Sequence, residues 1–284
     1  MNTPTTPAGT SSIAPTVPTV HAAWPVPLPA CVQVARHGAI AVLTLSRPDK
    51  RNALSDELVL GLQSFFSSIP ADVQGVVMHG AGDNFCAGLD LNELQETTVA
   101  ESFNTSQIGQ RLNDTVQFCK VPVVAVLHGA VIGGGLELAA AAHVRVAETS
   151  AYYALPEGTR GIFLGSGGSV RLPRLIGTHT VMEMMLTGHV YGAEEAHHRL
   201  RLTHYLVAPG AGLAQGIALA EKMARNAPLA NFAIVQAMPR IADQDPQAGL
   251  FTEMLMVGIA QGDEQAKQRL RDFLARKAGK VLRT

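Results

Sequence analysis

The sequence predicts an α/β fold, and three observations support this prediction. Short, nearly continuous apolar runs, typical of strands buried on both faces of a sheet, occupy residues 39–46, 74–79 and 122–128. Amphipathic patterns with a helical period lie between these runs. Beyond about residue 168, strand patterns become rare and helical patterns dominate. We therefore expect alternating strands and helices followed by an all-helical C-terminal region.

The first 30 residues differ from everything that follows. They contain no charged residue and consist mainly of Pro, Thr, Ala and Ser. A segment of this composition buries too little apolar surface to offset the entropy that it loses on ordering. We therefore predict a disordered arm over residues 1–30, whose apolar end at residues 24–29 is able to dock on the folded body or on a neighbouring subunit.

The later elements each have a signal in the sequence. Ser55 and the two acidic residues after it are typical of a helix N-terminus, and the amphipathic pattern behind them continues to about residue 66. Residues 143–147 repeat the strand pattern. Because no shift in composition separates two domains, we assign residues 31–210 to one core and residues 211–284 to a C-terminal helical region. Further helices are predicted at 181–188, 194–198, 213–226 and 264–277.

The composition excludes several classes of partner. The chain has 284 residues, of which 47% are apolar and 16% charged, as expected of a globular protein with a substantial core. Its formal net charge is −1, so it lacks the basic field that attracts nucleic acids or anionic membranes. No apolar stretch reaches the length of a membrane-spanning helix, and the N-terminus lacks a secretory pattern. The three cysteines are widely spaced without a CxxC pair, which argues against disulfides. We expect a cytoplasmic protein whose partners are small molecules or other subunits.

Three consecutive glycines, Gly133, Gly134 and Gly135, connect a predicted strand to a predicted helix. Free N–H groups at a helix N-terminus, together with the helix dipole, favour an anion. A nucleotide phosphate is one candidate, although the spacing is not G-x-G-x-x-G and no GK[ST] follows. The other candidate is an oxyanion that develops during a reaction and needs two donors. The turn at residues 87–89 also follows a strand-like run and is able to supply the second donor. Either turn alone is equally consistent with a tight strand-to-helix connection.

Two glutamates near these turns are candidate acid–base groups. Glu137 lies in the first turn of the glycine-led helix, in apolar surroundings, and Glu157 follows an intervening strand that returns the chain to the same end of the sheet. Burial raises the pKa of a carboxyl group, and two neighbouring carboxyls push their pKa values apart. Such a pair can hold a proton on one group while the other is ionised. The alternative for each glutamate is a solvated surface position.

The ten histidines do not indicate a metal site. The sequence has neither an HExxH motif nor a Cys/His ligand spacing, and no GxSxG sequence marks a serine nucleophile. We therefore predict no metal. His128 lies close in sequence to the glycine loop and is able to line a pocket there.

Four motifs, in this order and spacing, resemble the enoyl-CoA hydratase/isomerase (crotonase) superfamily. They are 47-RPDKRNAL-54, 80-GAGDNFCAGLDL-91, 128-HGAVIGGGLELA-139 and 156-PEGTRGIFLGSGGSVRLPRLIG-177. The resemblance covers about residues 34–282. It implies a crotonase-type β-β-α spiral with two nearly perpendicular sheets and a C-terminal helical trimerisation region, whose trimers commonly pair into hexamers. It also implies an acyl-CoA substrate and no further cofactor, since coenzyme A is part of the substrate.

The resemblance assigns roles to single residues, and the implied reaction is syn hydration of a 2-enoyl-CoA. The oxyanion donors would be the backbone N–H groups of Leu89 and Gly134. Glu137 and Glu157 match the two catalytic glutamates of the hydratases, and the N–H of Gly165 matches a position that helps to hold the water. The residues implied to contact coenzyme A, of which the last two would reach a neighbouring subunit's coenzyme A, are Lys50, Arg51, Ala53, Ala87, Gly88, Leu89, Asp90, Leu91, Phe273 and Arg276. The basic residues among them are equally consistent with plain surface charge.

The chain departs from the commonest hydratase pattern at three places. Leu89 stands where a smaller Ala is common, residues 163–164 replace the usual Ile-Pro before Gly165, and Arg201 replaces a Gly. The stretches 154–177 and 225–241 look like methylthioacryloyl-CoA hydratases, which also break the thioester. The alternatives to simple hydration are therefore hydration followed by thioester hydrolysis, double-bond isomerisation, and a non-catalytic acyl-CoA-binding scaffold.

Overall fold

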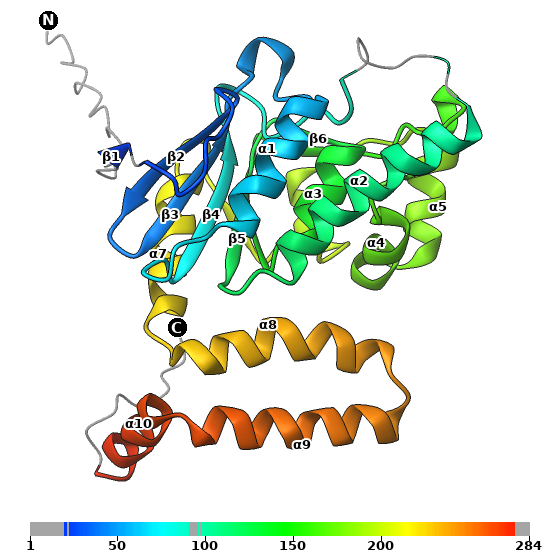
Figure 1. Ribbon diagram of the computed structural model, residues 1–284. Helices are drawn as coiled ribbons and strands as arrows, with labels where there is room; N and C mark the ends of the chain where they lie inside the picture. Colours follow the sequence, from blue (N-terminus) through cyan, green and yellow to red (C-terminus); the bar gives the residue numbers. More distant parts are fainter. Residues whose placement is uncertain (1–19, 22, 91–95, 97, 276–284) are drawn as a thin grey trace, which may run out of the picture.

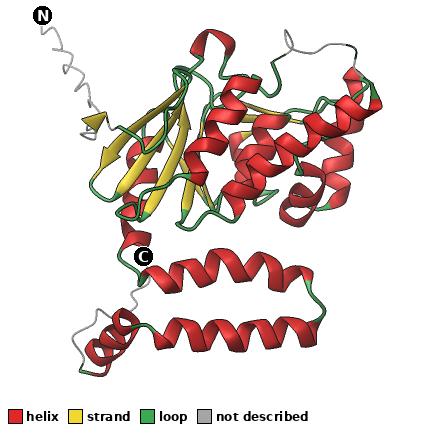
Figure 2. Cartoon of the chain, in the orientation of Figure 1, coloured by secondary structure: helices red, strands yellow, loops and turns green. Residues whose placement is uncertain are grey.

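The computed structural model describes residues 20–21, 23–90, 96 and 98–275. Figure 1 shows a twisted sheet with helices packed beside it and a helical hairpin that extends from this body, and Figure 2 shows the same elements by type. The strands are β1 (Val20–His21), β2 (Val32–His37), β3 (Ile40–Leu45), β4 (Gly75–Gly80), β5 (Val123–Leu127), β6 (Ala130–Ile132), β7 (Val144–Glu148), β8 (Tyr152–Ala154), β9 (Tyr191–Gly192) and β10 (Tyr205–Val207). The helices are α1 (Asp56–Ser67), α2 (Val99–Gln117), α3 (Gly134–Ala141), α4 (Gly168–Ile176), α5 (Thr178–Thr187), α6 (Ala193–His198), α7 (Gly212–Ala224), α8 (Pro228–Asp243), α9 (Pro246–Gly262) and α10 (Glu264–Leu274).

The larger sheet has seven strands in the order β1-β2-β3-β4-β5-β7-β10. β2 and β3 form an antiparallel hairpin, whereas β3, β4, β5, β7 and β10 run parallel. All residues of β5 are buried, because helices cover both faces of the sheet. On one face, α7 packs through Ile217 and Ala220 against alternate strand residues. On the other face, α1 packs through Leu58, Leu62 and Phe65.

The strands and the first helix predicted from the sequence are confirmed. β3, β4, β5 and β7 each lie within about a residue of the predicted runs. The side chain of Ser55 accepts a hydrogen bond from the N–H of Leu58 at 3.3 Å, so it caps α1 as the sequence predicts. The predicted helices at 181–188, 194–198, 213–226 and 264–277 correspond to α5, α6, α7 and α10, as far as the structure describes them.

The smaller sheet positions the loops that matter for function. β6 pairs with β8 in parallel and β8 pairs with β9 antiparallel. Ile132, the last residue of β6, lies opposite Ala154, the last residue of β8. The loops that follow the two strands therefore start side by side, and the N–H of Gly133 donates to the carbonyl of Ala154 at 2.9 Å. The return of the chain to one end of a sheet, predicted from the sequence, takes place here.

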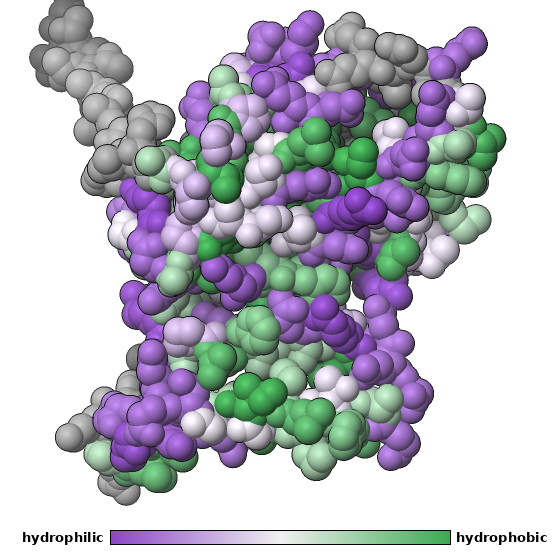
Figure 3. Space-filling view, in the orientation of Figure 1, coloured by the Kyte–Doolittle hydropathy of each residue, from purple (hydrophilic) through white to green (hydrophobic). Residues whose placement is uncertain are grey.

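The C-terminal helices divide into two groups. We expected the helical region to begin at residue 211, but its first helix, α7, covers the main sheet and belongs to the core. The helices that leave the body begin with α8, which forms a hairpin with α9 that lies beside the core in Figure 1. Large apolar side chains on this hairpin are exposed, and Figure 3 shows them gathered over it. They include Phe232, Ile234, Met238, Leu250, Phe251, Met254 and Leu255. None of the described helices is both long enough and apolar enough to cross a membrane.

The described part of the N-terminal arm is in contact with the body. β1 pairs with β2, and the ring of Trp24 stacks on Phe65 of α1 with centroids 4.5 Å apart. The indole N–H of Trp24 lies 3.0 Å from the hydroxyl of Ser68. The apolar end of the arm thus docks on the folded body of its own chain, one of the two placements that the sequence allowed. Residues 1–19 and 22 lie outside the described residues.

Candidate active site

The loop after β6 explains the three consecutive glycines one by one. Gly133 has φ +52°, and a Cβ atom there would lie 2.6 Å from Oε1 of Glu157. A Cβ atom at Gly135 would overlap the carbonyl oxygen of Cys86. A Cβ atom at Gly134 would be only 3.1 Å from Cδ1 of Leu54. Gly133 and Gly135 therefore require glycine, because the loop passes close to a carboxylate at the first and to a second loop at the other, whereas a methyl group at Gly134 would need only a small shift of Leu54.

The second loop is fastened to the first by backbone hydrogen bonds. The N–H of Cys86 donates to Ala130 at 3.0 Å, and the N–H of Ile132 donates to Cys86 at 3.1 Å. Gly88, with φ +92°, comes so close that an added Cβ atom would lie 2.8 Å from the carbonyl oxygen of Ile132 and 3.6 Å from the nitrogen of Gly134. The two glycine turns predicted to act together are therefore adjacent in space.

Two backbone amides at this junction have no backbone partner. Within the part of the chain that the structure describes, the N–H groups of Leu89 and Gly134 donate to no backbone carbonyl, although their neighbours Leu54, Asp90 and Gly133 all do. The nitrogen of Leu89 lies 3.9 Å from the position that a Cβ atom of Gly134 would take. Gly134 is the first residue of α3, so the dipole of that helix adds to the positive potential at its amide. Such a pair of amides is suited to an oxygen that gains negative charge.

Glu137 is buried and is held by the amides of another loop. Its side chain is 3% exposed, and its Oε1 accepts hydrogen bonds from the N–H of Ser166 at 2.9 Å and of Gly168 at 2.7 Å. A Cβ atom at Gly168 would overlap the Glu137 side chain, so this close approach also requires glycine. Burial raises the pKa of Glu137, while the two amide hydrogen bonds act in the opposite direction.

Glu157 is buried without a comparable set of donors. It is 7% exposed, and its Oε2 is a buried oxygen with no hydrogen-bond partner among the described residues. Burial raises the pKa of Glu157 to about 7, and the charge of Glu137 adds to this increase. The structure therefore places both predicted glutamates in one buried region, one on α3 and the other directly after β8, and gives them different surroundings.

Several of the residues predicted to contact coenzyme A lie on two loops that are joined to each other. Lys50 and Arg51 are exposed on the loop after β3, which is joined to the glycine loop by the hydrogen bond from the N–H of Ala87 to the carbonyl of Arg51 at 3.0 Å. Ala53 and Gly88 are buried beside them. The side chain of Asp90 is also buried, and it forms an ion pair with Arg47 at 2.8 Å. Asp90 therefore stabilises the loop through its side chain and has only its backbone to offer a ligand.

The remaining predicted residues lie on other loops and helices or outside the described residues. Gly165 lies in the loop before α4 whose amides surround Glu137, and its carbonyl accepts from the hydroxyl of Ser106 at 2.6 Å. Phe273 is exposed on α10, which Figure 1 shows beyond the α8–α9 hairpin and away from α3 of the same chain. Leu91 and Arg276 lie outside the described residues.

Sequence reasoning missed the groups that hold the first glutamate. The amides of Ser166 and Gly168 donate to Glu137, and their signal was the glycine-rich run 164-LGSGG-168, which was used only for Gly165. Arg47, the partner of Asp90, was also missed. The ring of His128 lies 3.1 Å from the carbonyl oxygen of Gly82. No group of three or more potential metal ligands occurs among the described residues.

The chain is similar to known proteins over most of its length. The model of the family described as enoyl-CoA hydratase/isomerase matches residues 35–279. The (E)-benzylidenesuccinyl-CoA hydratase of Thauera aromatica is 32% identical over 254 residues, which cover 88% of this chain and 98% of the relative. The 2,3-dehydroadipyl-CoA hydratase of Escherichia coli (strain K12) is 32% identical over 246 residues, which cover 86% and 95%.

The solved structures show the same fold. A crystal structure from Rhodopseudomonas palustris CGA009, provisionally named an enoyl-CoA hydratase, is 52% identical, covers 89% of this chain and 97% of that chain, and has a TM-score of 0.84. A structure of an enoyl-CoA hydratase from Bacillus anthracis is 29% identical with a TM-score of 0.82, and covers 88% and 98%. The predicted α/β spiral fold is therefore confirmed.

Proposed function

The chain belongs to the enoyl-CoA hydratase/isomerase family, and from this premise we propose that it is a lyase that adds water across the double bond of a 2-enoyl-CoA. The main observation behind the proposal is that two backbone amides and two buried glutamates lie at one glycine loop. Two backbone amides that have no backbone partner among the described residues lie next to each other, and two buried glutamates lie beside the same glycine loop. The names of the two curated relatives reported above, both hydratases of CoA thioesters, support the same reaction class.

In the proposed mechanism, the amides of Leu89 and Gly134 bind the thioester oxygen. This oxygen gains negative charge when hydroxide adds to Cβ and the substrate becomes an enolate. Donors that are in place before the charge develops need no reorganisation, and one such donor is worth roughly 10²–10³ in kcat. The hydrogen bonds between the loops at Cys86 hold the two amides at a fixed spacing.

The two glutamates divide the proton transfers. Glu137 is held by two amides, so it is suited to accept a proton from the attacking water as the C–O bond forms. Glu157, whose pKa is about 7, is suited to donate a proton to Cα as the enolate collapses. One water is consumed: its hydroxide ends on Cβ, Cα receives a proton from Glu157, and the proton on Glu137 returns to Glu157 through solvent. In this proposal the amide of Gly165 orients the water.

The residues around the site support contacts to coenzyme A and a narrow space for the acyl group of the substrate. Lys50 and Arg51 would bind phosphates from their exposed loop, and the backbone from Ala87 to Leu91 would line the pantetheine. Leu89, whose side chain is 40% exposed, stands where a smaller residue is common and would narrow the space for the acyl group. The acyl chain itself is best identified by assay.

We further propose that the chain forms homotrimers, or hexamers made from two trimers. The exposed apolar side chains on α8, α9 and α10 support this assembly, because a surface of this kind is normally covered by another chain. Phe273 and Arg276 would then reach a neighbouring subunit's coenzyme A. A cytoplasmic location, and the absence of a requirement for any cofactor other than substrate coenzyme A, remain predictions from the sequence.

A product-resolved assay tests the reaction. Purified protein without added metal or redox cofactor is incubated with a panel of 2-enoyl-CoA thioesters that includes crotonyl-CoA and methylthioacryloyl-CoA. Hydration gives a 3-hydroxyacyl-CoA, isomerisation moves the double bond, thioester hydrolysis releases free coenzyme A, and a scaffold gives no product. We expect the 3-hydroxyacyl product, and any of the other results as the sole outcome contradicts simple hydration.

The roles of the glutamates are tested with matched variants. Glu137→Gln and Glu157→Gln should each lower kcat by about 100-fold or more, because each removes one proton transfer. Glu194→Gln removes an exposed carboxylate on α6 and should leave kcat unchanged. Normal turnover in both of the first two variants would contradict the assigned roles.

A further inference from the structure

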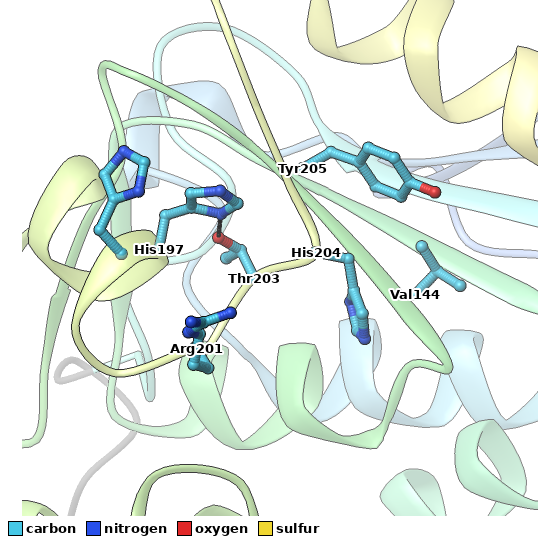
Figure 4. A pocket seen from close by; sticks show the side chains of 7 residues that line it. Val144, His197, Arg201, Thr203, His204 and Tyr205 are labelled. Atoms are coloured by element: carbon cyan, nitrogen blue, oxygen red, sulfur yellow. Dashed lines mark hydrogen bonds between the residues drawn. The ribbon is translucent and has the colours of Figure 1, made fainter. Parts of the chain in front are cut away.

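A cavity lies at the β10 edge of the main sheet, beside α6 and the segment that joins α6 to β10. It has a volume of about 610 Å³ and is lined by Val144, His197, His198, Arg201, Thr203, His204 and Tyr205. Figure 4 shows these side chains around the segment that joins α6 to β10. The lining holds one arginine, three histidines and two hydroxyl groups, and it includes no carboxylate among the described residues. The functional site described above uses none of these side chains.

Arg201 occupies a backbone conformation that ordinarily favours glycine. Its φ is +58°, and only two other described residues that are not glycine have a positive φ. The left-handed region is unfavourable for a side chain with a Cβ atom. A strained residue of this kind is a reason to look for a function of its side chain. Here, the side chain brings a permanent positive charge to the cavity.

A second positive charge lies directly behind the cavity. Arg145 on β7 is 4% exposed and forms no ion pair with any described residue. Its guanidinium donates only to the backbone carbonyls of Leu202 at 2.7 Å and Ala142 at 2.7 Å. The pKa of Arg145 is lowered by burial to about 10, so the group remains charged at neutral pH. A buried guanidinium without an ionic partner is poorly screened, so its positive potential acts on nearby groups.

His204 lines the cavity and is hydrogen-bonded to the backbone of Arg145. The backbone N–H of Arg145 donates to Nδ1 of His204 at 3.1 Å, so the neutral ring carries its hydrogen on Nε2 and offers a donor. Partial desolvation and then the charge of Arg145 lower the pKa of His204, which is the response expected in a positive field. On the other side, Nδ1 of His197 lies 3.1 Å from the hydroxyl of Thr203.

Two carboxylates on the elements beside the cavity have partners elsewhere. Glu195 of α6 forms an ion pair with Arg199 at 2.6 Å, and Glu148 at the end of β7 accepts from the N–H of Gly212 at 3.0 Å. Neither residue lines the cavity. The positive charges of Arg145 and Arg201 are therefore not neutralised from within the described chain at this place.

We propose that this cavity is a binding site for a phosphate-like oxyanion, either inorganic phosphate or the phosphate group of a small metabolite. The guanidinium of Arg201, Nε2–H of His204 and the ring of His198 supply donors, and Arg145 supplies a field that favours negative charge. The site is separate from the acyl-CoA site, and it does not depend on the reaction proposed there.

Calorimetric titration of the full chain with inorganic phosphate tests this site. All variants are measured in the Lys50→Ala/Arg51→Ala background, so that phosphate bound at the proposed coenzyme A loop does not contribute. We expect one phosphate per chain in that background. Arg201→Gly should weaken phosphate binding by about tenfold or more, because it removes a charged donor, whereas Arg201→Lys should keep most of it. Lys222→Ala removes an exposed positive charge on α7 and should change the affinity by less than about twofold.

The outcomes separate the alternatives. Arg201→Gly is not expected to unfold the chain, because glycine suits the backbone at this position, and a melting temperature in the absence of phosphate that is no lower than that of the parent verifies this. Loss of binding in Arg201→Gly with retention in Lys222→Ala supports the site. Equal affinity in both variants, or no measurable phosphate binding in the Lys50→Ala/Arg51→Ala background, overturns it. Pyrophosphate and a phosphorylated sugar, titrated in the same way, distinguish a free anion from a metabolite-borne phosphate.

Discussion

Replacing Gly88 with alanine should abolish most of the activity while both glutamates remain in place. The added methyl group would lie 2.8 Å from the carbonyl oxygen of Ile132, which is too close for a carbon atom and forces the two loops apart. The same methyl group would lie 3.6 Å from the nitrogen of Gly134. An oxygen that accepts from this amide belongs at about 2.9 Å. The methyl group would therefore crowd the place where the thioester oxygen is proposed to bind.

The expected magnitudes follow from these contacts. Loss of one oxyanion donor corresponds to a decrease in kcat of about 10²–10³, or roughly 2.7–4 kcal/mol in the activation free energy. Gly88 has φ +92°, a conformation that is unfavourable for alanine. The substitution should therefore lower the free energy of unfolding by about 1–2 kcal/mol through the backbone alone. The activity loss should thus be larger than a general loss of stability explains.

A matched variant separates the two effects. Gly210 has φ +79°, and no atom lies within 4 Å of the position of an added Cβ. Gly210→Ala should therefore show by urea unfolding the loss of stability that the left-handed backbone alone causes, and it should keep the wild-type kcat. Steady-state kinetics of both variants with the best substrate from the panel provide the measurement. If folded Gly88→Ala keeps kcat within about threefold of the wild type, the proposed role of these amides is refuted.

Four further results are expected. Because Glu157 must be protonated to act as an acid, kcat should fall as the pH rises through about 7, and a flat profile from pH 6 to 8 would argue against this role. The raised pKa also means that ionisation opposes folding: the contribution of Glu157 to stability is present at low pH and is lost between its ordinary value of 4.5 and about 7. Glu157→Gln should accordingly raise the melting temperature at pH 8 more than at pH 4, and the reverse order would contradict the burial argument. Arg201→Gly should raise the free energy of unfolding by about 1 kcal/mol, since it removes backbone strain. A lower free energy of unfolding, measured with urea, would show that contacts of the arginine side chain compensate the strain. Trp24→Ala should lower the free energy of unfolding by about 1–3 kcal/mol through the lost stacking on Phe65, and no change would indicate that the arm is detached in solution.

The main strands could be predicted because their sequences are apolar on both faces. β4 and β5 have helices on each side, so nearly every residue is apolar and the run is easily distinguished from its surroundings. β2 lies between β3 and the two-residue β1. Its polar residues Gln33, Arg36 and His37 interrupt the apolar run, so the sequence pattern did not predict this strand. α2 was missed because only Leu112, Asn113 and Val116 of its 19 residues are buried. A helix with so little buried surface has a weak apolar pattern.

The site could be predicted in part, since its chemistry depends on both side chains and backbone. Glu137 and Glu157 were recognisable as carboxylates in apolar surroundings, and the structure buries both. The partners of Glu137 are amides of Ser166 and Gly168, which carry no side-chain signal and depend on how a distant loop folds. The ion pair that occupies Asp90 likewise joins residues 43 positions apart, a distance over which local patterns give no information.

The role of the two amides as oxyanion donors is best tested by a crystal structure of the chain with a bound 3-hydroxyacyl-CoA or a non-hydrolysable acyl-CoA. We expect the thioester carbonyl oxygen to lie about 2.7–3.1 Å from the backbone nitrogens of both Leu89 and Gly134, with Cα and Cβ facing the carboxyl groups of Glu157 and Glu137. A thioester oxygen bound to any other group, with those two nitrogens facing solvent or protein, would contradict it.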